Sequence, residues 1–144
     1  MVNGAGVAGT TILAGDVLNG GEGTDTLTVS TAGAIGGTGY TVAAIQGTSI
    51  ENLMFNAYDT DAQDLTMDLT LFTDLQKVGT NSGSATGDLV LTGARSVLDM
   101  AINNMAGDVT MTYPSAVVSV LKGDQTQNIA VSGVTGQVSV AGVA

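Results

Sequence analysis

The sequence predicts an all-β protein, and within that class a parallel β-solenoid with one turn per about 20–25 residues. Three observations favour this fold. The 144 residues include 21 Gly, 20 Thr and 17 Val, a composition typical of extended strands joined by tight turns. Short stretches in which apolar residues alternate with other residues recur along the chain, as expected of half-buried strands. Their nearly constant spacing indicates turns stacked on one another.

The clearest repeated pattern is an acid or amide followed by an apolar, any and apolar residue. Its copies begin at Asp64, Asp88, Asp108 and Asn128. The first apolar residues of the copies are spaced by 24, 20 and 20 positions. Because inward side chains stack in a parallel solenoid, we expect two ladders of apolar side chains. One ladder is Leu65, Leu89, Val109 and Ile129, and the other is Met67, Leu91, Met111 and Val131.

A second pattern of spaced apolar residues lies between those copies and supplies another strand per turn. Its copies begin at Ile50, Leu75 and Val97, with a looser copy at Val117, and the spacings are 25, 22 and 20. We therefore expect solenoid turns over residues 45–144, preceded by a segment over residues 1–44 with a degenerate calcium-binding turn, the two parts forming one continuous domain. The stretch 131–140 has a shorter period and is expected to cap or join the stack. An antiparallel β-sandwich is the alternative, because it also contains regularly spaced short strands.

Charge and residue types exclude several classes of function. Three Lys and Arg against 13 Asp and Glu give a net charge of −10, which opposes binding to nucleic-acid phosphates. The chain has no Cys and no His, so the usual zinc and haem ligands and the common nucleophile and base pairs are missing. Paired carboxylates could still hydrolyse glycosides, but no Trp is present to stack a sugar. No apolar run approaches the roughly 20 residues of a membrane-spanning helix. We expect neither an enzyme nor a membrane-spanning protein.

One motif indicates a ligand-binding site. Residues 20–28, Gly-Gly-Glu-Gly-Thr-Asp-Thr-Leu-Thr, match the nonapeptide G-G-x-G-x-D-x-U-x, where U is an apolar residue, at every specified position. Asp16 and Leu18 repeat two of its positions nine residues earlier. Glycines allow a turn to aim its carbonyl oxygens inward, and an aspartate adds the anionic oxygen that Ca²⁺ prefers. We expect one calcium site with the carboxylates of Asp16 and Asp25 and the carbonyls of Gly21 and Gly23. Ordinary β-turns with solvated aspartates are the alternative.

Residues 14–27, followed by Ile50-Glu51-Asn52-Leu53, resemble a unit of RTX-type surface-layer proteins of Gram-negative bacteria. In that family a G-G-x-G-x-D turn leads to an I-E-x-L phrase and then to solenoid turns rich in Thr, Ser and Ala. The resemblance implies a calcium-dependent protein, exported by a type I pathway, that assembles into an ordered coat on the cell surface. The sequence departs from the family in having one good nonapeptide instead of a tandem block.

We therefore expect an extracellular structural protein whose copies assemble with one another in the presence of calcium. Cell-surface polysaccharide is a second candidate partner, and no nucleic acid is expected. The alternative function is a calcium-folded stalk or binding module of a type I-secreted RTX adhesin or toxin.

Overall fold

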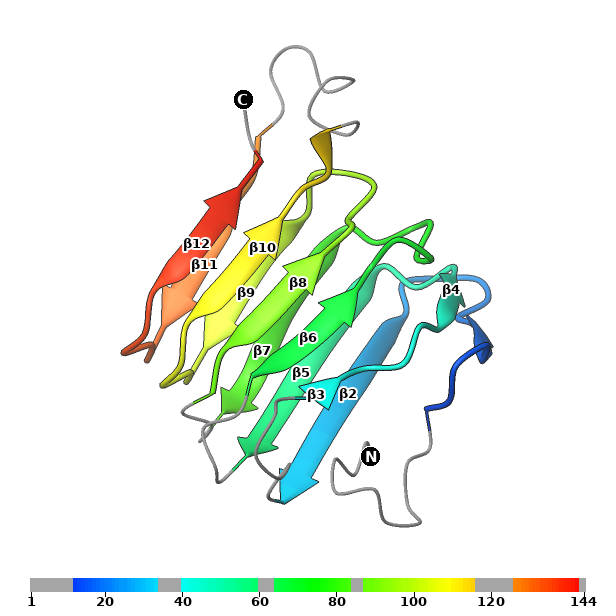
Figure 1. Ribbon diagram of the computed structural model, residues 1–144. Coiled ribbons are helices and arrows are strands. Elements are labelled where there is room, and N and C mark those ends of the chain that lie inside the picture. Colours follow the sequence, from blue (N-terminus) through cyan, green and yellow to red (C-terminus); the bar gives the residue numbers. More distant parts are fainter. Residues whose placement is uncertain (1–11, 34–39, 60–63, 84–86, 116–125, 143–144) are drawn as a thin grey trace.

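The chain forms two five-stranded parallel sheets, and it crosses from one to the other as it winds (Figure 1). The computed structural model describes residues 12–33, 40–59, 64–83, 87–115 and 126–142. The first sheet contains β2 (Thr26–Gly33), β5 (Asn52–Asp59), β7 (Lys77–Gly83), β9 (Asp99–Asn103) and β11 (Ile129–Ser132). The second contains β3 (Tyr40–Thr41), β6 (Leu65–Asp68), β8 (Leu89–Thr92), β10 (Val109–Thr112) and β12 (Val138–Ala141). A short third sheet pairs β1 (Val17–Asn19) with β4 (Gln46–Thr48).

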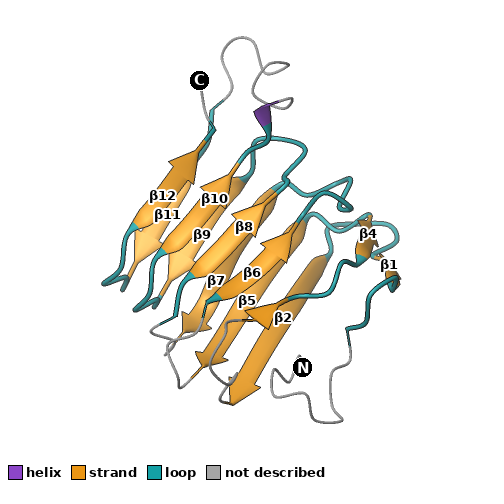
Figure 2. Cartoon of the chain, viewed as in Figure 1, coloured by secondary structure: helices purple, strands orange, loops and turns teal. Residues whose placement is uncertain are grey.

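All strand pairs in the described residues are parallel, and each turn adds one strand to each large sheet (Figure 2). This order confirms the predicted β-solenoid, of about four turns, and excludes the antiparallel sandwich. Both sheets run across the boundary expected at residue 45, because β2 pairs with β5 over eight residues and β3 pairs with β6.

The second sheet contains the two expected ladders of apolar side chains, with one error at the last turn. Leu65, Leu89 and Val109 are in register, but the fourth position belongs to Val138 and not to Ile129. In the other ladder Val140, and not Val131, follows Met67, Leu91 and Met111. Ile129 and Val131 lie in the first sheet, where Ile129 is in register with Met100.

The error has a physical reason in the lengths of the connections. Each crossing from β5, β7, β9 and β11 to the second sheet takes five residues: 60–64, 84–88, 104–108 and 133–137. The returning connections vary, with eight residues at 69–76, six at 93–98 and 16 at 113–128. The long third return moves every later strand out of the 20-residue period. The loose copy at Val117 lies outside the described residues.

The interior is a continuous apolar column between the two sheets. The largest fully buried side chains include Phe55, Leu53, Met67, Leu91 and Ile102. Thr80 is a fully buried polar side chain in this column, and its hydroxyl donates to the Asn103 carbonyl at 2.7 Å. The turns stack because each alone buries too little apolar surface to offset its ordering entropy.

A ladder of hydrogen bonds follows one corner of the solenoid, and we call its residues, Asp64, Asp88, Asp108 and Gln137, the corner ladder. Each is the last residue of a five-residue crossing. The carboxylate of each acid accepts the backbone N–H of the ladder residue in the next turn, at 3.2, 2.8 and 2.7 Å in order. The recurring acid therefore satisfies backbone donors that the strand pairing leaves over.

No helix among the described residues is both long enough and apolar enough to cross a membrane.

Candidate functional site

The glycine-rich turn of the nonapeptide connects β1 to β2 at the N-terminal end of the stack. Gly21 and Gly23 have φ angles of +96° and +117°, which L side chains rarely adopt. A Cβ at Gly20 would lie 1.9 Å from the Ser49 carbonyl oxygen. The Gly21 N–H donates to the Asn19 side-chain oxygen at 2.9 Å, which closes the turn. All three glycines are thus required by the backbone itself.

Asp25 is the last residue of this glycine-rich loop, and its backbone bonds to the neighbouring turn of the solenoid. Its N–H donates to the Glu51 carboxylate at 2.8 Å, and its carbonyl accepts the Asn52 N–H at 3.0 Å. Its carboxylate oxygen Oδ2 is buried and has no hydrogen-bond partner, a state found for no other buried side-chain atom in the described residues. A buried oxygen without a partner costs about 1–3 kcal/mol, and more when it is charged. An additional positive or hydrogen-donating group at this atom would remove that cost.

A cavity of about 310 Å³ lies beside Asp25. Its walls come from β1, the glycine turn, the start of β2 and the residue before Glu51: Leu18, Asn19, Gly20, Asp25, Thr26, Leu27 and Ile50. Asp25 is the acidic residue in its wall.

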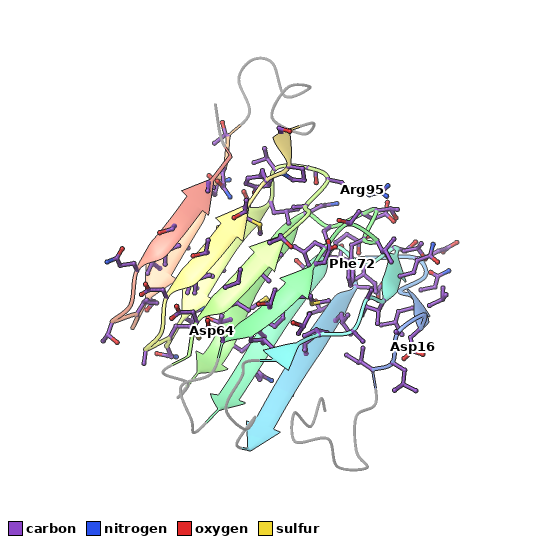
Figure 3. The ribbon with its side chains drawn as sticks, viewed as in Figure 1. Asp16, Asp64, Phe72 and Arg95 are labelled. Carbon is purple, nitrogen blue, oxygen red and sulfur yellow. The ribbon has the colours of Figure 1, made fainter. Side chains whose placement is uncertain are left out.

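Asp16, the other predicted carboxylate ligand, lies at the opposite end of β1 (Figure 3). Three strand residues separate the two ends by about 10 Å. The Asp16 carboxylate accepts the Leu13 N–H at 2.8 Å, and its backbone carbonyl accepts the Gln46 N–H at 2.8 Å. The structure therefore groups Gly21, Gly23 and Asp25 in one turn and places Asp16 in a separate turn. A calcium ion shared by both aspartates stays a prediction.

Glu51 also belongs to this site, although the sequence pattern alone does not predict its contact with Asp25. The signal is the register itself, since Thr26 pairs with Asn52 and the residues before them, Asp25 and Glu51, are neighbours across turns. In the part of the chain that the structure describes, no three acidic side chains converge as a metal cluster. A cation at this corner would need backbone carbonyl oxygens and water as further ligands, which suits Ca²⁺.

Four further aspartates stand close together in the sequence, at positions 59, 61, 64 and 68, and the described ones make separate hydrogen bonds. Asp64 belongs to the corner ladder. The Asp68 carboxylate accepts the Thr70 N–H at 2.8 Å and the Thr70 hydroxyl at 2.5 Å. Asp61 and the side chain of Asp59 lie outside the described residues. Hydrogen bonds from backbone N–H and hydroxyl groups therefore account for Asp64 and Asp68, the two aspartates whose side chains are described.

Two other side chains have shifted pKa values. Hydrogen bonds from the Thr73 hydroxyl and the Ser49 N–H lower the pKa of the exposed Asp74 carboxyl. Burial raises the pKa of the Tyr113 phenol, and the neighbouring Asp99 charge adds to this, while hydrogen bonds from Leu98 N–H and Gln127 oppose it. The Tyr113 oxygen receives both of these bonds at 3.0 Å and ties the end of the long return to the body of the solenoid.

No protein-family model, curated protein or solved structure matches this chain.

Proposed function

We propose that this chain is a structural segment of a bacterial cell-surface protein whose copies self-assemble when Ca²⁺ binds the glycine turn. The observation that carries the proposal is the buried, unpartnered Oδ2 of Asp25 beside a cavity. A carboxylate oxygen in a glycine-rich turn is the ligand type that Ca²⁺ prefers. The resemblance of the sequence to RTX surface-layer proteins points the same way.

The ion would act first on stability. Asp25 already contacts Glu51 and Asn52 in the next turn of the solenoid. A cation held at Asp25 would compensate its buried charge and fix the glycine turn against that neighbouring turn. The free energy of unfolding then rises with calcium, by about 2.7 kcal/mol at a free concentration one hundred times the dissociation constant.

The ion would act second on association. The net charge of −10 makes copies of the chain repel one another, and bound Ca²⁺ lowers that repulsion. Strands at the two ends of the sheets, such as β2 and β12, have one edge that pairs with no strand of the described chain. Such edges can pair with another chain. Assembly of stacked solenoids follows from these two properties.

The proposal is tested by titrating the chain with Ca²⁺ from an EGTA solution while measuring the melting temperature and the particle size. We expect the melting temperature to rise and ordered particles to appear in negative-stain electron microscopy. Asp25→Asn should abolish both effects. Asp68→Asn removes one charge at a different, exposed turn and serves as the matched control, and Mg²⁺ at equal ionic strength controls for charge screening.

Each outcome separates the candidate functions. A melting temperature that ignores Ca²⁺ would contradict calcium binding at the turn. A calcium-dependent rise without any particle growth would instead support the folded stalk of an RTX adhesin or toxin. Assembly that proceeds equally in EGTA would keep the structural role and remove calcium from the mechanism.

A further inference from the structure

The sequence contains two Asn-Gly pairs, at residues 3–4 and 19–20, and the second lies within the described part of the chain. Asn19 is the last residue of β1, and its side chain is exposed to water. Gly20 begins the glycine turn, and its missing Cβ leaves its backbone nitrogen unhindered. An asparagine with such a neighbour is prone to lose its side-chain nitrogen as ammonia without an enzyme.

The reaction at such a pair needs water alone. The Gly20 nitrogen gives up its proton and attacks Cγ of Asn19. The new N–Cγ bond closes a cyclic imide, the Cγ–Nδ2 bond breaks, and the side-chain nitrogen takes up a proton and leaves as ammonia. One water then opens the imide. Breaking the new bond leaves aspartate at position 19, and breaking the original peptide bond leaves isoaspartate, in which the main chain runs through Cβ and Cγ.

The pairing of β1 with β4 keeps the attacking nitrogen away from Asn19. The Gly20 N–H donates to the Thr48 carbonyl at 3.0 Å, and Asn19 itself is in register with Thr48. The Asn19 side-chain oxygen accepts the Gly21 N–H at 2.9 Å, which holds the amide group in place. In a strand, the backbone N–H groups point along the sheet and the side chains stand out from it. The attack therefore requires Gly20 to leave Thr48 first.

We propose that Asn19–Gly20 is a deamidation site that the pairing of β1 with β4 protects, so that the reaction proceeds when this corner of the solenoid opens. The inference goes beyond the proposed function and does not depend on calcium. β1 pairs with β4 over three residues, whereas β2 pairs with β5 over eight. A short pairing opens at a lower free energy than the body of the stack.

Either product changes the glycine turn. Aspartate at position 19 keeps an acceptor for the Gly21 N–H and adds a charge to the cavity wall that contains Asp25. Isoaspartate lengthens the main chain by a methylene group directly before Gly20. There the fit is tight, because a Cβ on Gly20 would lie 1.9 Å from the Ser49 carbonyl oxygen. The isoaspartyl chain should therefore fail to re-form the bond from Gly20 to Thr48, and the corner stays open.

The first test follows the reaction at Asn19 in EGTA at one mildly alkaline pH, for the folded chain and for the chain unfolded in guanidinium chloride. Cleavage before Asp16 and Asp25 releases residues 16–24, in which Asn19 is the single asparagine, for mass spectrometry. We expect the folded chain to react at least about tenfold more slowly, equivalent to about 1.4 kcal/mol of opening free energy. Asn128, exposed and followed by the branched Ile129, is the matched control and should react little in either state. Equal rates at Asn19 in the two states would overturn the proposal.

The second test weakens the pairing of β1 with β4. Gln46→Pro removes the N–H that donates to the Asp16 carbonyl at 2.8 Å, and it should speed the reaction at Asn19 severalfold in the folded chain. Gln137→Pro, the matched control, removes the N–H that donates to the Asp108 carboxylate in the last turn, and it should leave the rate at Asn19 unchanged. Equal acceleration by the two variants would show that the reaction passes through global unfolding, and would overturn the role of this corner.

The wild type gives the same answer if Gln46→Pro does not fold. Below the unfolding transition, the rate at Asn19 should change little with guanidinium chloride, because a local opening exposes little surface. A steep rise with denaturant would show that the whole chain must unfold, and would overturn the proposal.

Discussion

Replacing Asp88, the middle acid of the corner ladder, separates the two effects of a stacked carboxylate. Asp88 accepts the Asp108 N–H at 2.8 Å, and its own N–H donates to Asp64 at 3.2 Å. Asp88→Ala removes the acceptor and leaves the N–H of the half-buried Asp108 without its partner. We expect this variant to lose about 1–3 kcal/mol of stability.

Asp88→Asn keeps an acceptor of nearly the same shape and removes only the charge. Adjacent strands lie about 4.8 Å apart, so consecutive ladder carboxylates are close neighbours. Two unit charges about 5 Å apart in water repel by about 0.8 kcal/mol, so relieving both neighbours of Asp88 contributes up to about 1.6 kcal/mol. The weaker hydrogen bond to a neutral acceptor costs roughly 1 kcal/mol. The two effects nearly cancel, and Asp88→Asn should lie within about 1 kcal/mol of the wild type.

Urea denaturation followed by far-ultraviolet circular dichroism, at low and at high sodium chloride, measures both effects. Salt screens the repulsion within the ladder, so the wild type should gain more stability from salt than Asp88→Asn does. Asp68→Asn, which lies outside the ladder, should keep the full response to salt. The reasoning is refuted if Asp88→Asn is as unstable as Asp88→Ala, because the charge and not the acceptor would then stabilise the corner.

Three further predictions test the core, one titrating group and one turn. In urea denaturation, Leu91→Ala, in the middle of a ladder, should lower the free energy of unfolding by about 3 kcal/mol, and Val140→Ala, at a half-buried site in the last turn, by about 1 kcal/mol or less. Equal losses would contradict the stacked core. Burial raises the folded-state pKa of Tyr113, so the neutral phenol contributes its full stabilisation below a pH of about 10, and this is lost as the pH rises through the raised pKa. Tyr113→Phe should flatten that decline in a plot of melting temperature against pH. Gly133→Ala should destabilise the chain in the same denaturation assay, because φ is +63° and the new Cβ would lie 2.5 Å from the Asn104 side-chain oxygen; an unchanged midpoint would contradict that turn geometry.

The sequence was sufficient to predict the fold class and most of its register. Alternation at Leu65, Leu89 and Val109 predicts strands, and their spacings of 24 and 20 residues predict stacking, because the crossings all take five residues and the first two returns differ by only two. The same pattern at Asn128 was misleading. It fits both sheets, since in both a polar residue comes directly before the first apolar residue that packs in the stack, and only the 16-residue return decides between them. The length of a connection between strands cannot be read from the spacing of apolar residues within the strands.

The candidate site shows a different limit of sequence reasoning. The glycines of the nonapeptide are explained by backbone geometry at Gly20, Gly21 and Gly23, so the turn would require them with or without an ion. Their presence therefore cannot distinguish a calcium site from an ordinary turn. The atom on which a test must act is Oδ2 of Asp25, because it is buried without a hydrogen-bond partner. Asp25→Asn is consequently the more informative variant: in the absence of calcium it should stabilise the chain by relieving a buried charge, and in its presence the wild type should become the more stable of the two.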